Sequence, residues 1–306
     1  MTFFRLLRLP NLIILVVTLY TITQRVIYPP LIAHKIVPAL TSKEYLLFLF
    51  IALCVGAGGY VYNDIVDQKT DLENNKRLIV GHKITNKIAL GTYLFLMIAP
   101  LLPMLSLTME LHRPDYLLYY LFVVVILWLY NQFLKKMPLI GNIVVASLCA
   151  FAVYMPYILE MEGMVILKQT DLQSYREAFN IIIAFTVFSF LANLIREIIK
   201  DIEDIEGDQA DGHKTFPIAY SIEKANTLVL AFTVILLVLI IAWTIPFIID
   251  FNISTFLSSL LLILPLGYLI AKIRKATESI HYYNLSQYWK LYFAVGIISL
   301  VMMTYS

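Results

Sequence analysis

The 306-residue sequence is 60% hydrophobic and only 14% charged, whereas soluble domains carry about a quarter charged residues. This composition excludes an ordinary soluble protein and predicts an all-α polytopic membrane protein. The net charge of +2 is small, and no basic stripe interleaved with aromatic residues is present, so nucleic acid is not an expected partner. Cys54 and Cys149 both lie in apolar segments, which argues against a disulfide framework or a thiolate metal site.

Nine apolar segments are each long enough to cross a bilayer as a helix, which takes about 20 residues. We expect spans at residues 12–27, 46–66, 86–107, 116–134, 139–159, 179–200, 225–248, 252–271 and 289–305. Arg5 and Arg8 precede the first span as in a signal peptide, but no small-residue cleavage site follows, so we interpret this segment as an uncleaved span. The sequence predicts one transmembrane domain over residues 1–306.

The distribution of Lys and Arg predicts the orientation of these spans. With the N-terminus in the cytoplasm, seventeen Lys and Arg residues lie in cytoplasmic segments and six lie on the other side. Cytoplasmic loops of membrane proteins carry such an excess of positive charge. The last cytoplasmic group consists of Lys272, Arg274, Lys275 and Lys290. We therefore predict a multi-pass protein of the cell membrane with a cytoplasmic N-terminus.

Two acidic stretches, residues 63–71 and 200–208, repeat the pattern D-x-x-D-x-x-x-D. Each closes an apolar span on the predicted cytoplasmic side, and this repetition suggests two related halves of the domain. Because a helix turns about 100° per residue, the three aspartates of each stretch are expected to share one narrow arc. The six aspartates are Asp64, Asp67, Asp71, Asp201, Asp204 and Asp208. Carboxylates at the edge of an apolar environment are costly unless cations neutralise them, so the motifs predict a functional site.

Magnesium chemistry suits two such clusters. Mg²⁺ prefers oxygen ligands and usually binds through a few carboxylates together with substrate phosphates. We expect the six aspartates to act as metal ligands and catalytic residues that hold Mg²⁺ against a diphosphate, with basic side chains neutralising the remaining charge. The candidate substrate-binding residues are Asn63, Lys76, Arg77, Lys83, Lys135, Asn142, Arg196 and Lys200.

Ordinary structural roles compete for several of these candidates. The excess of cytoplasmic positive charge would by itself place Lys and Arg in these loops. Lys135 could extend its ammonium group to the membrane surface, and Asn142 could join two helices through a polar contact. Arg196 and Lys200 lie at the end of a span rather than in the middle of a loop, which favours a functional role.

The motif N-D-x-x-D-x-x-x-D at residues 63–71, with a second aspartate motif at 201–208, resembles the UbiA-type intramembrane prenyltransferases. The nine predicted spans agree with that family, so the resemblance covers nearly the whole chain. It implies a helical bundle around a central cavity that opens sideways to lipid. It also implies Mg²⁺-dependent transfer of a polyprenyl group from a prenyl diphosphate donor to a lipophilic acceptor.

The same resemblance implies roles for individual residues. The first motif would supply one metal cluster, with Asn63 beside it. In the second motif, Asp204 and Asp208 match the family's D-x-x-x-D pattern, and Asp201 extends it.

Two segments depart from the commonest family pattern. Many members carry Y-x-x-x-K before the second motif, where this chain has Arg196 and Lys200. Many also have a proline-rich R-P segment after the first motif, whereas residues 75–81 read N-K-R-L-I-V-G. The stretch 196–208, followed by K-T-F-P at 214–217, looks most like the branch that contains digeranylgeranylglyceryl phosphate synthases. That likeness implies a prenylglycerol phosphate acceptor.

Other functions remain open on the sequence alone. Within the same reaction class, the acceptor could be an aromatic quinone precursor such as a hydroxybenzoate or a dihydroxynaphthoate. From another class, paired acidic sites could serve a cation transporter, although transport sites usually lie near the bilayer midplane rather than at span ends. A CDP-alcohol phosphotransferase also uses aspartates and Mg²⁺, but its motif needs glycines that this chain lacks.

Overall fold

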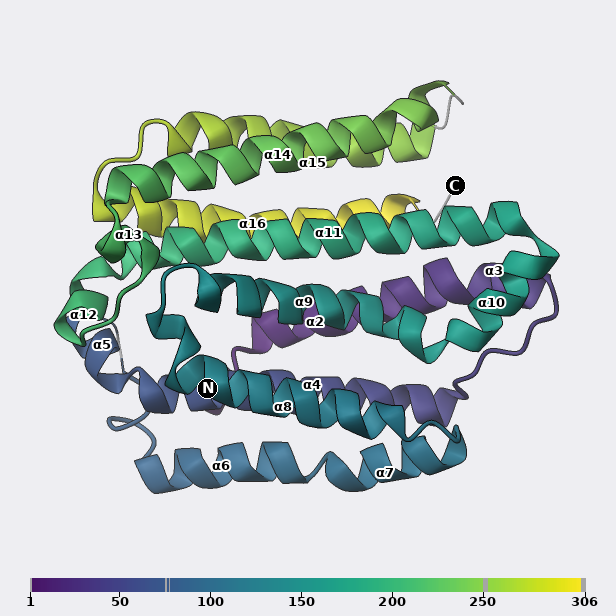
Figure 1. Ribbon diagram of the computed structural model, residues 1–306, viewed down its shortest axis with the longest axis horizontal. Helices are drawn as coiled ribbons and strands as arrows, with labels where there is room; N and C mark the ends of the chain where they lie inside the picture. The colour runs from purple at the N-terminus through teal and green to yellow at the C-terminus, as the bar shows by residue number, and fades with distance from the viewer. Residues whose placement is uncertain (1, 75, 77, 250–252, 304–306) are drawn as a thin grey trace.

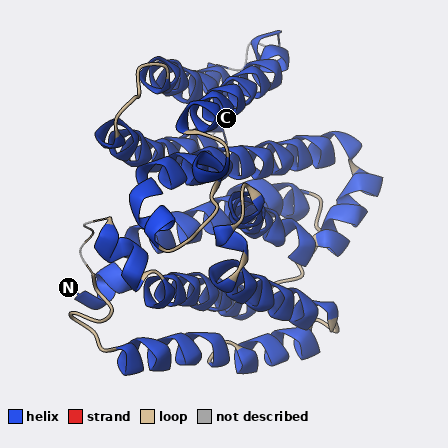
Figure 2. Cartoon of the chain, turned by 60° about the vertical axis from the view of Figure 1, so that its left-hand side comes forward, coloured by secondary structure: helices blue, strands red, loops and turns tan. Residues whose placement is uncertain are grey.

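The computed structural model describes residues 2–74, 76, 78–249 and 253–303. Within these ranges the chain is helical and contains no strand (Figure 2). Nine helical segments of the described chain are long and apolar enough to span a membrane, which confirms the predicted fold class and number of spans. Helices suit a bilayer because their backbone N–H and C=O groups are satisfied internally.

Most of the spans are single helices, and two are composite. The single helices are α4 (Ser42–Val66), α8 (Asp115–Gln132), α9 (Ile140–Leu159), α11 (Leu172–Glu203), α14 (Ile222–Ile249), α15 (Ile253–Ile273) and α16 (Ser279–Met303). The composite spans are α2 (Leu9–Thr21) with the π-helix η1 (Ile22–Ile27) and α3 (Tyr28–Ala33), and α6 (Asn86–Ile98) with α7 (Leu101–Glu110). The shorter helices are α1 (Thr2–Leu6), α5 (Gln68–Glu73), the 3₁₀-helix η2 (Leu134–Lys136), α10 (Met161–Thr170), α12 (Ile205–Ala210) and α13 (Phe216–Ala219).

The spans stack side by side in a bundle (Figure 1). α14 and α15 form one edge of the bundle, while α6 and α7 form the other. Between these edges, α11 packs against α9 and α16, and α4 packs against α2 and α8. Large apolar side chains of the edge helices, such as Phe95 and Leu264, are exposed, as a surface in contact with lipid requires.

Two predicted span boundaries are wrong at their N-terminal ends. The sixth span begins at Leu172 rather than near residue 179, and Asp171 caps it by accepting hydrogen bonds from the N–H groups of Gln173 and Ser174. The ninth span begins at Ser279 rather than near residue 289. Its first turns are polar and rich in tyrosine, so hydropathy alone does not reveal them.

The longer ninth span changes the location of Lys290. The count of basic residues assigned Lys290 to a cytoplasmic segment, but it lies inside α16, one residue after the fully buried Trp289. Tyr282 and Leu285 pack α16 into the core before this position. Tertiary packing therefore extends the helix through a segment whose composition resembles a loop.

Candidate active site

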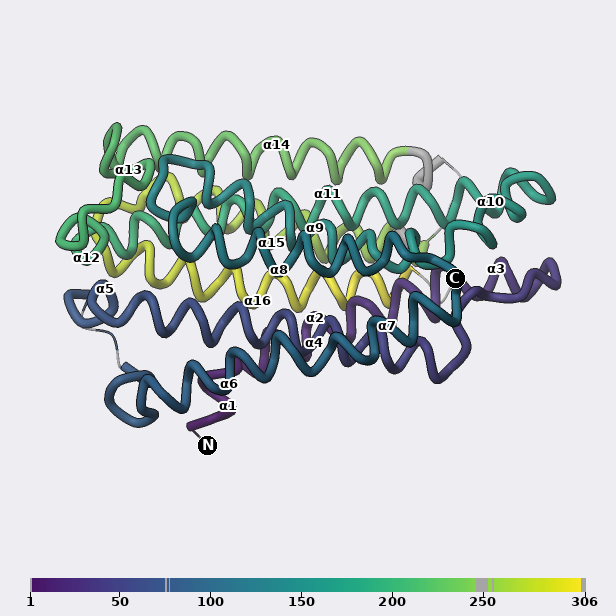
Figure 3. The backbone as a smooth tube through the Cα atoms, turned by 60° about the horizontal axis from the view of Figure 1, so that its bottom comes forward, coloured from purple at the N-terminus to yellow at the C-terminus, as the bar shows by residue number. Residues whose placement is uncertain are grey.

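Both aspartate motifs lie at the same end of the bundle, which we call the motif end. α5 and α12 pack against each other there (Figures 1 and 3). Each motif bends at its middle aspartate, since Asp67 separates α4 from α5 and Asp204 separates α11 from α12. Their ψ angles of 7° and 10° lie outside the α-helical region. The expected straight helical arc is therefore wrong, and each motif is a kinked helix.

Hydrogen bonds of the helical type continue through both bends. Asp71 N donates to Asp67 O at 2.8 Å, and Asp208 N donates to Asp204 O at 3.0 Å. Gly207 lies within α12 and does not end the helix. The third aspartate of each motif thus stays one turn beyond the bend.

Arg8 connects the N-terminal segment to the first motif. Its Nη2 donates to Asn63 Oδ1 at 3.0 Å and to Asp64 Oδ1 at 2.8 Å. The guanidinium also lies over the Tyr60 ring, 5.0 Å from its centroid. The backbone of Arg8 is left-handed, with φ 50° and ψ 51°, which is uncommon for a residue other than glycine. This turn between α1 and α2 directs the side chain toward Asp64.

Lys135 neutralises the middle aspartate of the first motif. Its ammonium group forms an ion pair with Asp67 Oδ1, and its side chain is only 9% exposed. Asn63 Nδ2 donates to Asp67 Oδ2 at 2.6 Å and to Asn131 Oδ1 at 3.2 Å. Burial lowers the pKa of the Lys135 ammonium, and the Asp67 carboxylate opposes that effect. Lys135 therefore lies at the first motif rather than at the membrane surface.

Lys76 joins the two motifs. Its ammonium group pairs with Asp204 Oδ1 and lies 3.9 Å from Asp71 Oδ1. The side chain of Asn74 adds two hydrogen bonds, donating to Asp204 O at 3.3 Å and accepting from Gly207 N at 2.8 Å. Burial raises the pKa of the Asp71 carboxyl group, against the opposing charge of Lys76.

The last aspartate of the second motif belongs to a network that ends on α5. Asp208 Oδ1 lies 3.0 Å from His213 Nδ1, and His213 Nε2 lies 3.2 Å from Asp211 Oδ2. Lys69 of α5 pairs with Asp211 Oδ1 at 2.9 Å. The hydrogen bond from Lys69 lowers the pKa of the Asp211 carboxyl group. This network is a second connection between α5 and α12.

Of the remaining predicted residues, some contact the motifs and others do not. Asp201 accepts a hydrogen bond from Asn142 Nδ2 of α9 at 2.9 Å, which is the helix-joining contact considered for Asn142. Lys83 is exposed in the loop before α6 and lines neither cavity described below. The structure therefore does not bring Lys83 to the motifs. The loop closes on itself, with hydrogen bonds from Gly81 N to Ile84 O at 2.8 Å and from Lys83 N to Ile79 O at 2.9 Å, and leaves the Lys83 side chain exposed. Arg77 lies outside the described residues.

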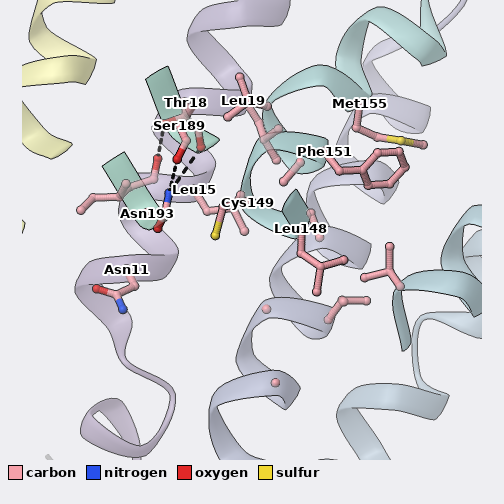
Figure 4. A pocket seen from close by; sticks show the side chains of 18 of the residues that line it. Asn11, Leu15, Thr18, Leu19, Leu148, Cys149, Phe151, Met155, Ser189 and Asn193 are labelled. Atoms are coloured by element: carbon pink, nitrogen blue, oxygen red, sulfur yellow. Dashed lines mark hydrogen bonds between the residues drawn. The ribbon is translucent and has the colours of Figure 1, made fainter. Parts of the chain in front are cut away.

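Two cavities meet at the motif end. The smaller, of 180 Å³, is bordered by Arg5, Arg8, Asp64, Asp71 and Lys76 together with three apolar residues. The larger, of 420 Å³, is lined by residues of α2, α4, α7, α8, α9, α11 and α16. Figure 4 shows part of its wall, where Leu15, Leu148 and Phe151 surround the space. Arg8 borders both cavities.

Charged residues gather at one end of the larger cavity. Arg196, Lys200 and Lys290 line it, close to Arg8. Arg196 Nη1 pairs with Glu197 Oε1 at 2.6 Å, while its buried Nε has no hydrogen-bond partner among the described residues. Within the same described part of the chain, neither Lys200 nor Lys290 has a carboxylate at ion-pair distance. Lys200 and Lys290 are therefore available to an anion that enters the cavity, whereas Arg196 is paired with Glu197, which lines the same cavity.

Sequence reasoning missed several residues of this cluster. Arg8 was counted only as a charge flanking the first span, and Lys290 only as a cytoplasmic charge. Asn74 and His213 follow the two motifs and carry no pattern that marks them. The sequence offers one indication that Lys290 belongs to the site, because it is a lone cation between aromatic residues of one apolar segment.

The donor set of the site agrees with the chemistry of Mg²⁺. Asp64 and Asp71 present oxygens to one cavity beside Lys76, and Mg²⁺ needs only one or two carboxylates when phosphates and waters complete its shell. In the described ranges, no three His, Cys, Asp or Glu side chains converge on one point. Five of the six motif aspartates are held instead by a cation or an amide, and Asp208 is held by the imidazole of His213. The residues therefore fit a metal that arrives with a phosphate-bearing ligand.

The fold and site define an intramembrane transferase of prenyl groups. Residues 26–291 match the model of the UbiA prenyltransferase family, so the chain belongs to this family and is a prenyltransferase. Membership of this family excludes a cation transporter and a CDP-alcohol phosphotransferase as explanations of the two motifs.

Similar proteins and structures agree with this assignment. The chain is 30% identical over 222 residues to the digeranylgeranylglyceryl phosphate synthase of Sulfurisphaera tokodaii, covering 72% of this chain and 70% of that one. It is also 30% identical to the enzyme of the same name from Sulfolobus acidocaldarius, over 74% of each chain. A solved structure described as a digeranylgeranylglyceryl phosphate synthase in membranes superposes with a TM-score of 0.62 at 21% identity, covering 99% and 97% of the two chains.

Structures with bound ligands have the same fold. A UbiA homologue from Archaeoglobus fulgidus, solved with GPP and Mg²⁺, superposes with a TM-score of 0.56 at 15% identity, covering 98% of this chain and 99% of that one.

Proposed function

We propose that this chain transfers a polyprenyl group from a prenyl diphosphate to a prenylglycerol phosphate in a Mg²⁺-dependent reaction. The observation that carries the proposal is the arrangement of the motif end. Asp64 and Asp71 of the first motif border a small polar cavity together with Lys76, which pairs with Asp204 of the second motif. Arg8 borders both this cavity and a long apolar one. A diphosphate fits the first environment, and an isoprenoid tail fits the second.

The aspartates would hold the metal and the diphosphate together. Asp64 and Asp71 would provide Mg²⁺ ligands from the first motif, with Asp67, Asp204 and Asp208 close behind. When bound, Mg²⁺ would stabilise the negative charge that develops on the leaving diphosphate. Lys76 and Lys135, which now pair with the aspartates, would then be free to donate to phosphate oxygens.

Cationic side chains and the apolar wall support the chemical step. Arg8 and Lys200 are positioned to stabilise the diphosphate as the allylic C–O bond ionises. The apolar lining of the longer cavity would keep water away from the carbocation until the acceptor captures it.

A phosphate-bearing acceptor is supported by the surplus of positive charge. Lys200 and Lys290 line the long cavity in addition to the cations that pair with the motifs, and the third cation there, Arg196, pairs with Glu197 of the same lining. A phosphate monoester on the acceptor carries a charge of about −1.5 to −2 at pH 7 and would neutralise both lysines, whereas the carboxylate of a hydroxybenzoate supplies a single negative charge. The names of the relatives favour the same acceptor. An aromatic quinone precursor is the competing acceptor, and no feature of the cavity specifically favours it.

The positive-inside distribution supports an orientation with the N-terminus and both motifs on the cytoplasmic side of the cell membrane. The water-soluble diphosphate head of the donor would then enter from the cytoplasm, and both isoprenoid tails would come from the bilayer.

Acceptor choice can be tested with purified protein, Mg²⁺ and geranylgeranyl diphosphate. A mixture of a prenylglycerol phosphate and a hydroxybenzoate is supplied, and the products are analysed by mass spectrometry. We expect the ether-lipid product and its loss on chelation of Mg²⁺. Aromatic product without lipid product would overturn the proposed acceptor.

The site assignment is tested by Asp64→Asn and Asp204→Asn. We expect each variant to insert normally and to lose prenyl transfer, while the matched variant Glu73→Gln on the exposed face of α5 keeps it. Near-normal turnover in either aspartate variant would refute the model in which both motifs bind the metal and the diphosphate.

A further inference from the structure

We propose that Glu197 is the general base of the reaction and takes the proton of the acceptor hydroxyl while the hydroxyl oxygen bonds to the prenyl group. This inference rests on the proposed function, because it assumes an acceptor that reacts through a hydroxyl group. Glu197 lines the long cavity from α11, and its side chain is 13% exposed. A carboxylate inside a membrane bundle is costly, and such residues usually belong to a functional site.

The lining of the long cavity offers few groups that can accept a proton. Among the described residues of this lining, Glu197 is the only one with a carboxylate, and none of them is a histidine. The other ionisable side chains there are arginines, lysines, tyrosines and a cysteine, and side chains of these classes usually keep their protons at neutral pH. By its chemical class, Glu197 is therefore the lining residue suited to act as a base.

Glu197 lies close to the place where the donor must react. On α11 it comes four residues before Asp201, which puts it about 6 Å from the second motif along the helix and on the same face. With the diphosphate at the motif end and the tail in the long cavity, the bond that breaks lies between these two environments. Arg8 and Lys200 also lie close to Glu197, so the carboxylate stands where the charged and apolar parts of the site meet.

Arg196 holds this carboxylate by one of its two oxygens. Arg196 Nη1 donates to Glu197 Oε1 at 2.6 Å. In the part of the chain that the structure describes, no hydrogen bond or ion pair involves Glu197 Oε2. The pair therefore orients the carboxylate and leaves one oxygen available to the hydroxyl group of an acceptor.

The motif aspartates are less suited to this role. None of the six lines the long cavity, in which the lipophilic acceptor would lie. Their oxygens are also the ones that Mg²⁺ would occupy, and a lone pair bound to a metal does not accept a proton.

The proposed step balances atoms and electrons. The allylic C–O bond of the donor breaks, and its electron pair leaves with the diphosphate. The hydroxyl oxygen of the acceptor forms the new ether bond to the allylic carbon, and the hydroxyl proton passes to Glu197 Oε2. The protonated carboxyl group returns this proton to water at the motif end when the products leave.

Glu197→Gln tests the base directly. The amide keeps the size of the side chain and an oxygen that accepts from Arg196, but it cannot take the proton. With Mg²⁺, geranylgeranyl diphosphate and a prenylglycerol phosphate, we expect kcat to fall about a hundredfold or more and the KM for the donor to stay unchanged. Glu177→Gln, at an exposed carboxylate of α11 that lines neither cavity, should keep wild-type turnover. Wild-type kcat in Glu197→Gln would overturn the inference and assign the proton to the leaving diphosphate.

Ionisation of the donor distinguishes a base from a residue that holds the diphosphate. The donor carries an isotopic label at its bridging oxygen, and the acceptor is replaced by an analogue that has hydrogen in place of the hydroxyl group. Ionisation followed by recombination moves the label to the other oxygens of the same phosphate. We expect this exchange at close to the wild-type rate in Glu197→Gln and its loss in Asp64→Asn. Loss of the exchange in Glu197→Gln would contradict the inference, because Glu197 would then act on the donor.

Glu197→Asp separates proton transfer from a purely structural role. Aspartate keeps a carboxylate but withdraws it by about one C–C bond, or 1.5 Å. We expect kcat of Glu197→Asp to exceed that of Glu197→Gln about tenfold, since general-base catalysis needs a basic group within hydrogen-bond reach. Thermal unfolding of both variants is measured beside turnover. Equal kcat in the two variants, or a loss of kcat that follows a loss of stability, would refute the inference.

The product of the wild-type protein separates this inference from the proposed function. If the wild type prenylates an aromatic carbon and forms no ether, the proposed function and this inference both fail. If the wild type forms the ether product and Glu197→Gln forms it equally fast, the inference alone fails.

Discussion

Arg8 combines an unusual backbone with an unusual position. A left-handed non-glycine residue costs free energy, and Arg8 is the residue that borders both cavities while it bonds to Asn63 and Asp64. Packing of the helices around position 8 does not by itself require a guanidinium group. The strain is consistent with a role in separating the head group of a ligand from its tail.

Replacement by lysine tests that role. Arg8→Lys keeps the charge but cannot bond to Asn63 and Asp64 through a planar guanidinium. We expect prenyl transfer to fall about tenfold or more, from the loss of a charged hydrogen bond of about 1.5–3 kcal/mol. Arg274→Lys, at an exposed arginine that lines neither cavity, is the control. Equal turnover in Arg8→Lys and wild type would exclude a specific role for the guanidinium.

Lys290 allows a test of how the acceptor is recognised. We expect Lys290→Gln to raise the KM for a prenylglycerol phosphate about tenfold and to leave the KM for the donor unchanged. A tenfold change corresponds to the loss of one charged interaction of about 1.4 kcal/mol. The exposed Lys275 gives the control variant Lys275→Gln. A change in the donor KM instead would place Lys290 with the diphosphate.

Close contact between α5 and α12 sets the distance between the motifs. Gly207 of α12 leaves no room for a side chain, because an added Cβ would collide with the carbonyl oxygen of Thr70 and the side chain of Asn74. The hydrogen bond from Gly207 N to Asn74 Oδ1 depends on this approach. Any side chain at position 207 must push the two short helices apart.

Gly207→Ala should therefore separate the motifs. We expect a loss of stability of about 1–3 kcal/mol, typical of overpacking, and a larger proportional loss of activity. Thermal unfolding and turnover of the purified protein are measured together. Gly91→Ala in α6, where an added Cβ meets nothing within 4 Å, should be neutral. Full activity in Gly207→Ala would show that the motifs tolerate a wider spacing.

The ion pair between Lys69 and Asp211 predicts a pH dependence. The hydrogen bond from Lys69 lowers the pKa of Asp211 below its ordinary value of 3.8. The pair therefore contributes stability above that value and loses it as the pH falls through the pKa of the folded state. We expect Asp211→Asn to destabilise the protein by less than about 1 kcal/mol at pH 7, since Lys69 is exposed. The difference in stability from wild type should vanish at a pH below the folded-state pKa of Asp211. Unfolding curves recorded at pH 7 and at that lower pH measure this difference.

At the scale of the whole molecule, the bundle places both motifs at one end. The proposed cytoplasmic orientation of the motif end can be tested by labelling single cysteines in intact cells. His82→Cys should react only after the membrane is opened, and Val37→Cys should react from outside. Both positions are exposed, the native Cys54 is buried, and the half-buried Cys149 is first replaced by serine. The reverse pattern would invert the proposed topology.

Composition and spacing were sufficient to predict the helical class, the nine spans and the two aspartate motifs. Long apolar segments have few alternatives in a bilayer, since only helices satisfy their own backbone groups locally. The motifs could be recognised because their carboxylates have no structural reason to stand beside apolar segments. The interpretation of the chain as two related halves stays a prediction.

Tertiary structure decided the contacts that depend on distant segments. The pairing of Arg8 with Asp64, the link from Lys76 to Asp204 and the position of Lys290 in the cavity join residues far apart in the sequence. A local pattern carries no information about such contacts, because they depend on how the helices pack. The lining of the long cavity was decided in the same way, since it is built from seven different helices.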